Sequence, residues 1–155
     1  MRRLSGLLVA GAIMLLPALS QSHGTAHAQA AQALTFDGDT AILTVAIKPD
    51  KTAAFEQIMT KVREALMKSE KPERKQQAAG WKVVKSPTAM KDGNIIYMHV
   101  LNPVVKGADY TILALLYEAN TDPAVQRALF EQYRDAFAAN LGGSAFTTAV
   151  DLSKP

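Results

Sequence analysis

Apolar side chains recur at regular spacings along residues 41–80, and these spacings predict a strand followed by two helices. Residues 41–47 are dense in apolar and β-branched residues, which predicts a strand. Residues 51–69 carry apolar side chains at helical spacing, which predicts an amphipathic helix with Asp50 as its N-cap. Its stripe consists of Phe55, Ile58, Met59, Val62 and Leu66. Residues 72–79 predict a short solvated helix, because Pro72 suits a first helical position.

The next elements are a hairpin and an ambiguous segment. Residues 81–85 and 95–101 predict two strands, and the Asp92-Gly93 pair between them is a turn signal. Residues 108–119 fit either a strand or a helix capped by Asp109, and we favour the helix. The pattern therefore predicts a β-hairpin followed by a further helix.

The last elements are a longer helix and a final strand. Asp122 and Pro123 fit the N-cap and first position of a helix, and the Asn140–Gly143 run is expected to end it. Residues 145–152 then predict the last strand. The order predicts an α+β fold, a ferredoxin-like βαββαβ sandwich with its helices on one face of a four-stranded antiparallel sheet. Residues 41–155 form this one domain, and the expected strand order is 4-1-3-2.

The first residues have the three-part organisation of a secretory signal peptide. Arg2 and Arg3 form a positive start, residues 7–19 are apolar, and Ala26-His27-Ala28 fits the pattern of small residues that signal peptidase reads. We therefore expect residues 1–28 to be removed, with residues 29–40 as a flexible lead-in; a cut two residues later is the second choice. A membrane anchor is the alternative, but the apolar stretch is shorter than the roughly 20 residues that span a bilayer. This predicts a periplasmic or secreted bacterial protein.

Removal of the signal peptide changes the charge and the candidate chemistry. Without Arg2 and Arg3, 15 of the 17 basic residues remain with 14 acidic ones, which gives a net charge of +1. This charge does not indicate binding to nucleic acid or, after cleavage, to a membrane. The chain has no cysteine, and the mature part keeps a single histidine, His99, which cannot supply the usual zinc ligands. The sequence also lacks a nucleophile elbow and a phosphate-binding loop, so we assign no catalytic residue and no metal ligand.

The element order, together with Gly80-Trp81-Lys82-Val83 at the start of the second strand, resembles the dimeric α/β-barrel superfamily of antibiotic-biosynthesis-monooxygenase-like domains. The run of residues 71–81 is also similar to one in small uncharacterised exported bacterial proteins. The resemblance implies a homodimer in which two sheets pack face to face and enclose a pocket. The superfamily includes monooxygenases, haem-degrading enzymes and proteins of no known activity.

Three side chains are candidates for contacting a ligand. The apolar residues Ile96 and Met98 are expected to face the helices, which places Tyr97 and His99 on the opposite face of their strand. Trp81 is a candidate for the same cavity, although packing in the core or at an interface is the usual role of a lone tryptophan. The alternative is a purely structural role, in which His99 makes hydrogen bonds at a dimer interface and contacts no ligand.

The sequence leaves the activity open between three hypotheses. The first is an exported, non-enzymatic protein that binds a small apolar or aromatic ligand in a pocket at a dimer interface. The second is a monooxygenase-like enzyme or a haem-binding enzyme that uses the same pocket. The third is a structural dimer with no ligand. No cofactor is expected under the first hypothesis, and haem belongs only to the second.

Overall fold

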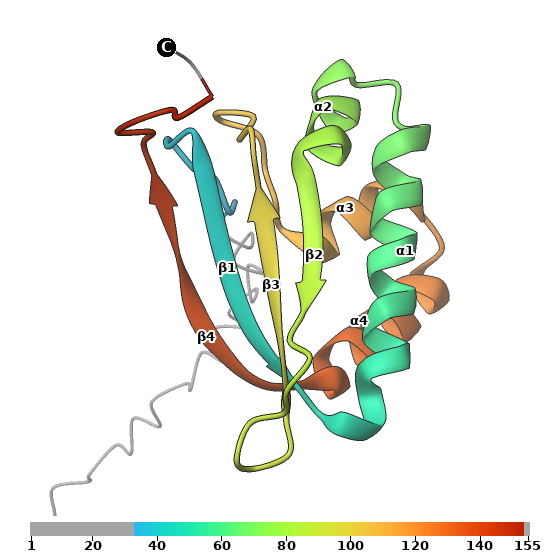
Figure 1. Ribbon diagram of the computed structural model, residues 1–155. Coiled ribbons are helices and arrows are strands. Elements are labelled where there is room, and N and C mark those ends of the chain that lie inside the picture. Colours follow the sequence, from blue (N-terminus) through green and yellow to red (C-terminus); the bar gives the residue numbers. More distant parts are fainter. Residues whose placement is uncertain (1–32, 154–155) are drawn as a thin grey trace, which may run out of the picture. The chain divides into compact units, whose positions relative to one another are not determined.

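A computed structural model describes residues 33–153 (Figure 1). The predicted signal peptide and its cleavage point lie outside these residues. The elements run β1 (Thr40–Ile47), a 3-10 turn (Pro49–Lys51), α1 (Thr52–Lys68), α2 (Pro72–Gly80), β2 (Trp81–Lys85), β3 (Ile95–Leu101), α3 (Ile112–Ala119), α4 (Pro123–Ala136) and β4 (Phe137–Phe146). The protein therefore has the mixed α+β architecture that the sequence predicts.

The four strands form one antiparallel sheet in the order β2-β3-β1-β4. This is the order expected from the sequence. β2 and β3 form the predicted hairpin, with Trp81 opposite Leu101 and Val83 opposite His99. On the other side of β3, Leu43 of β1 lies opposite His99. His99 thus occupies the middle of a row that crosses three strands.

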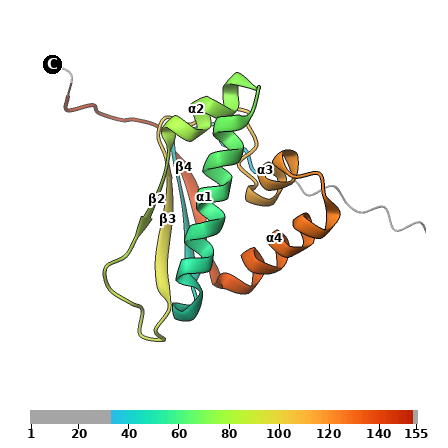
Figure 2. The same cartoon turned by 90° about the vertical axis from the view of Figure 1, so that its right-hand side faces the viewer.

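All the helices lie on one side of the sheet, as Figure 2 shows. One cluster of buried residues joins α1, α3 and α4, and a second joins α1 to the sheet. Phe55 is fully buried in the second cluster, where it contacts the ring of Tyr97 at a centroid distance of 4.8 Å. The stripe predicted along α1 therefore faces both the sheet and the other helices.

Several element ends differ from the expectation. The favoured helix within residues 108–119 is confirmed as α3, although it begins only at Ile112. Asp122 caps α4 by accepting a hydrogen bond from the Ala124 amide at 2.8 Å. The prediction that α4 ends at residues 140–143 and that a strand follows at 145–152 is wrong. β4 begins at Phe137, because residues 137–146 pair with the whole of β1 and so satisfy their backbone hydrogen bonds.

Two predicted helix caps are also wrong. Asp50 lies in the 3-10 turn, and α1 begins after Lys51 without a side-chain cap. Asp109 lies before α3 rather than at its N-cap, which is Thr111. Its carboxylate instead accepts hydrogen bonds from the amides of Thr111 and Leu34.

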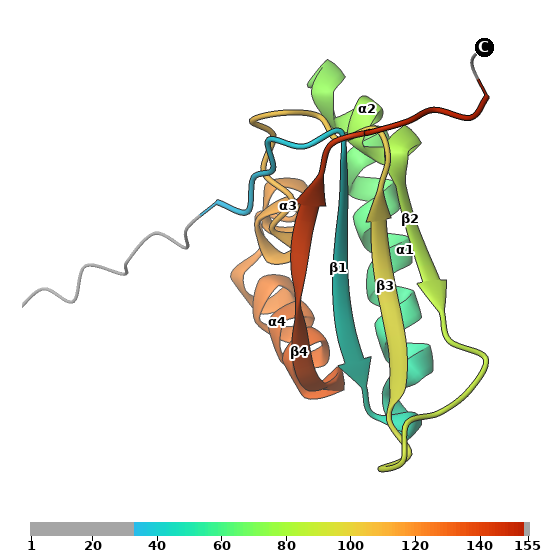
Figure 3. The same ribbon diagram turned by 60° about the vertical axis from the view of Figure 1, so that its left-hand side comes forward.

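The described part of the lead-in is tied to the body of the domain. The Tyr110 amide donates to the Leu34 carbonyl at 2.8 Å, and the Phe36 ring contacts the Tyr110 ring at 5.7 Å. Tyr110 in turn contacts Trp81 at 5.4 Å. Because Trp81 lies against α1 at its residues Met59, Val62 and Leu66, this aromatic chain runs on the helix side of the sheet. Figure 3 shows the backbone of the opposite face of the sheet. These lead-in residues therefore leave the opposite face open.

Candidate functional site

The three predicted ligand-binding side chains lie together, but on the face opposite to the expected one. Tyr97 and His99 are each only 2% exposed, and both rings contact Phe55 of α1. They therefore face the helices, and the prediction that they point away from them is wrong. The cause is strand parity, because alternate side chains point to opposite faces, so Ile96 and Met98 take the open face instead. Tyr97 and His99 can be buried because both find hydrogen-bond partners there.

Trp81 and His99 form a directly bonded pair. The indole Nε1 of Trp81 donates to Nδ1 of His99 at 3.2 Å, and the ring centroids are 5.8 Å apart. Burial lowers the pKa of His99 from 6.5 to about 4, because the charged form would lose its hydration. The imidazole is therefore neutral at physiological pH. Any group bound by His99 would have to reach Nε2, since Nδ1 is already an acceptor.

Tyr97 belongs to a second polar cluster that connects the sheet to α1. Its hydroxyl donates to Oε1 of Glu56 at 2.5 Å, and Nζ of Lys85 lies 3.1 Å from the same oxygen. The hydrogen bonds from Tyr97 and Lys85 lower the pKa of Glu56, and burial raises the pKa of Tyr97. The hydrogen bond to Glu56 of α1 thus holds Tyr97 in place, and Lys85 of β2 bonds to the same carboxylate.

The cavity beside Trp81 is small. The cavity that Trp81 lines has a volume of about 40 Å³ and lies between α1 and β2. Such a volume holds about one water molecule, whereas sites for organic ligands have roughly 300 Å³ or more. Tyr97 and His99 do not line this cavity, and the pocket predicted at a dimer interface stays a prediction.

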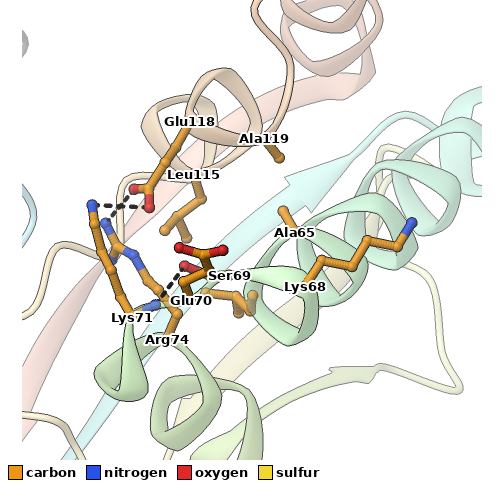
Figure 4. Close-up of a pocket in the computed structure, with 10 residues that line it drawn as sticks. Ala65, Lys68, Ser69, Glu70, Lys71, Arg74, Leu115, Glu118 and Ala119 are labelled. Atoms are coloured by element: carbon orange, nitrogen blue, oxygen red, sulfur yellow. Dashed lines mark hydrogen bonds and ion pairs between the residues drawn. The ribbon is translucent and has the colours of Figure 1, made fainter.

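A cavity of ligand size lies elsewhere, between the end of α1, the start of α2 and α3 (Figure 4). Its volume is about 420 Å³. The apolar part of the lining consists of Ala65, Leu66, Leu115 and Ala119, and the polar part of Lys68, Ser69, Glu70, Lys71, Arg74 and Glu118. We refer to it as the α1–α2–α3 cleft.

Two cations meet one carboxylate at an end of this cleft. Nζ of Lys71 lies 2.9 Å from Glu118, and an Nη of Arg74 lies 2.8 Å from the other oxygen of the same carboxylate. The hydrogen bond from Lys71, followed by that from Arg74, lowers the pKa of Glu118. Figure 4 shows Lys71 and Arg74 converging on Glu118, with Leu115 beside them.

Arg74 and Gln77 contradict the expectation that the polar residues of 72–79 are solvated. Arg74 is 9% exposed and Gln77 is fully buried. Arg74 donates to the Gln77 side-chain oxygen at 2.8 Å and to the Asp109 carbonyl at 2.9 Å, and Gln77 donates to that same carbonyl. A signal was present in the sequence, because positions 74, 77 and 81 follow the spacing of one helix face, with Trp81 at its end.

Comparison of the chain with protein-family models, with curated proteins and with solved structures finds no match. Within residues 33–153, no helix is long and apolar enough to cross a membrane. The same residues contain no group of three or more His, Asp or Glu side chains arranged to hold a metal ion.

Proposed function

We propose that the protein is an exported, non-enzymatic binding protein that acts as a homodimer, with a second copy covering the open face of the sheet. The observation that carries this proposal is the distribution of polar atoms between the two faces of β3. The helices cover the face with Tyr97 and His99, whose hydroxyl and Nδ1 respectively are bonded within the chain. The more uniformly apolar face is the one that the described chain leaves open.

The open face is apolar across three strands. On β3 it presents Ile96, Met98 and Val100, and the residues opposite these on β1 and β2 extend it with Ile42, Thr44 and Val84. Val84 and Met98 are 43% and 39% exposed. The only charged residue of these strands on this face is Lys82, which lies on the outer strand opposite Val100. Such a surface favours a partner with an equally apolar face.

The free edge of β4 adds to the same surface. β4 has ten residues without a single charge, and every residue after Phe137 is exposed (Figure 3). Natural proteins protect edge strands by keeping them short or by placing charges on them. The opposite edge follows this rule, because β2 has five residues and includes Lys82 and Lys85. The unprotected edge at β4 therefore favours coverage by another chain.

A second copy is the occupant that this surface fits best. A face of four strands, each about seven residues long, measures roughly 450 Å² in projection, since strands lie about 4.8 Å apart and rise about 3.4 Å per residue. An apolar patch of that size equals the largest patch on a typical monomer, and such patches often serve as interaction surfaces. Two copies of one face carry the same charges, so they can pack together only where that face has few charged residues. On β1, β2 and β3 this face has one charged residue, Lys82.

Sedimentation equilibrium of residues 29–155 tests the proposal directly. We expect twice the chain mass at micromolar concentration. Met98→Lys should yield monomers, because it places a charge in the middle of the face. Met67→Lys is the matched control, since Met67 is 54% exposed on α1 and lies on the helix side. A monomeric wild-type protein, or an equal effect of both substitutions, contradicts the dimer.

Export is tested by the intact mass of the protein recovered outside the cytoplasm. A mass that begins at Gln29 agrees with the proposed cleavage, and a mass that retains residues 1–28 contradicts it.

An enzyme or haem protein that uses Trp81, Tyr97 and His99 is not favoured by this geometry, because the three side chains bond within the core. An absorbance spectrum of the purified protein tests that alternative, since bound haem would give a strong visible band.

A further inference from the structure

We infer that the α1–α2–α3 cleft binds a small organic acid with one carboxylate and an apolar body. This inference names the ligand of the proposed binding function, but it does not depend on the dimer, because the cleft lies in the helix layer. Its volume of about 420 Å³ falls within the range of sites for small organic molecules. The charged end and the apolar wall formed by Leu66 and Leu115 match the two parts of such a ligand.

Arg74 provides a fixed donor at the charged end. Its two Nη atoms are held by Gln77, the Asp109 carbonyl and Glu118. Its Nε is buried and has no hydrogen-bond partner among the described residues. A buried N–H group without an acceptor is unfavourable, so an acceptor atom that reached Nε would stabilise the site. Arg74 also lines the cleft, so its guanidinium lies beside the space that a bound carboxylate would occupy.

Lys71 and Ser69 supply further donors at the same end. An ammonium group has three N–H donors, and only the contact with Glu118 engages Lys71. The Ser69 oxygen accepts from the Lys71 amide at 3.3 Å, which leaves its hydroxyl hydrogen free to donate to a ligand. Glu118 already shows that Lys71 and Arg74 together hold a carboxylate. A second carboxylate at this end would share the same two cations.

The acidic residues of the cleft limit the charge of the ligand. Glu70 lines the cleft beside this end and has no cationic partner among the described residues (Figure 4). Together with Glu118 it would repel a phosphate or a diacid more strongly than a single carboxylate. The apolar wall requires the rest of the ligand to be uncharged. These two limits select a monocarboxylic acid with a hydrocarbon chain or ring.

Calorimetry with octanoate, octanamide and octylamine tests this inference, because the three probes share one apolar chain and differ in charge. We expect octanoate to bind and octanamide to bind at least fivefold more weakly. Lys71→Ala should weaken octanoate by about fivefold, the size expected from the loss of one partly exposed ion pair. Glu70→Gln should tighten it, since a repulsive charge is removed. Lys75→Ala on the exposed side of α2 should have no effect.

Three results would overturn the inference. The first is an absence of octanoate binding at millimolar concentration. The second is equal or tighter binding of octylamine or octanamide. The third is octanoate binding that neither Lys71→Ala nor Glu70→Gln alters in a folded protein. Sedimentation measures the oligomeric state and calorimetry measures ligand binding in the cleft, so either proposal can fail without the other.

Discussion

The indole Nε1 of Trp81 donates a hydrogen bond to Nδ1 of His99 across the β2–β3 pair, over 3.2 Å. An indole N–H can only donate, so Nδ1 must be an unprotonated acceptor and the imidazole proton must reside on Nε2. Both residues lie on the face covered by the helices, and His99 is 2% exposed. The packing of Trp81 against His99 therefore determines which nitrogen of the imidazole carries the proton.

The first prediction concerns the tautomer of His99. We expect nitrogen NMR of residues 29–155, in which His99 is the single histidine, to show a pyridine-like Nδ1 and a pyrrole-like Nε2. Trp81→Phe removes the donor and should allow the other tautomer to appear. A wild-type spectrum with the proton on Nδ1 would contradict the pair.

The second prediction is a loss of stability in mild acid. The pKa of His99 is about 4 in the folded protein, below its ordinary value of 6.5. The unfolded chain therefore takes up a proton first, and the free energy of unfolding should fall as the pH drops from 6.5 to 4. The full loss from this group is about 3 kcal/mol. Urea unfolding at a series of pH values measures it.

His99→Gln is the matched control for this experiment. Its side-chain carbonyl can accept from Trp81 but cannot titrate. Carboxylates with a lowered pKa, such as Glu56 and Glu118, also reduce stability in acid, and both proteins share that effect. The difference between the two pH curves therefore isolates His99. Parallel curves between pH 6.5 and 4 would show that His99 titrates normally.

The third prediction concerns the contact between Tyr97 and Glu56. Tyr97→Phe should reduce the free energy of unfolding by about 1 kcal/mol, because a part-buried hydrogen bond to a half-exposed carboxylate is lost. Glu56→Gln should have an effect of similar direction. A double-mutant cycle by urea unfolding should yield a coupling energy of about 1 kcal/mol. Additive effects of the two substitutions would mean that the hydrogen bond does not form in solution.

The fourth prediction concerns Gly80, where α2 passes directly into β2. A Cβ atom there would lie 2.5 Å from the Pro103 carbonyl oxygen, so the backbone would have to shift. Gly80→Ala should therefore cost about 1–3 kcal/mol of stability. Gly107→Asn is a suitable control, because position 107 has open space and asparagine tolerates its positive φ of 75°. Equal urea midpoints for Gly80→Ala and the wild type would contradict the contact.

Local sequence patterns predicted the elements that depend on neighbouring residues. The bounds of β2 and β3 agree with the expected 81–85 and 95–101, and Asp122 caps α4 as predicted. Periodicity, turn residues and caps act within a few positions of one another, so the sequence displays them directly. The element order then restricted the topology, and the sheet has the expected order.

The C-terminal end of α4 could not be predicted from local sequence patterns. Val125, Leu129, Tyr133 and Phe137 continue one helical stripe, so the pattern itself has no break at residue 137. The helix stops at Ala136, because pairing with β1 provides partners for the backbone of residues 137–146. Hydrogen bonds to a strand 90 or more positions away compete with the helix, and they leave no pattern in the neighbouring residues.

The sequence alone determined that β3 is a strand with one wholly apolar face and one face that carries Tyr97 and His99, but only the tertiary structure decided which face lies inside. The choice rests on Glu56 and Trp81, which accept from Tyr97 and donate to His99 from positions 41 and 18 residues away. Arg74 is buried for the same reason, since Gln77, Asp109 and Glu118 surround it. A polar side chain enters a core only when partners meet it there, and those partners come together only when the chain folds.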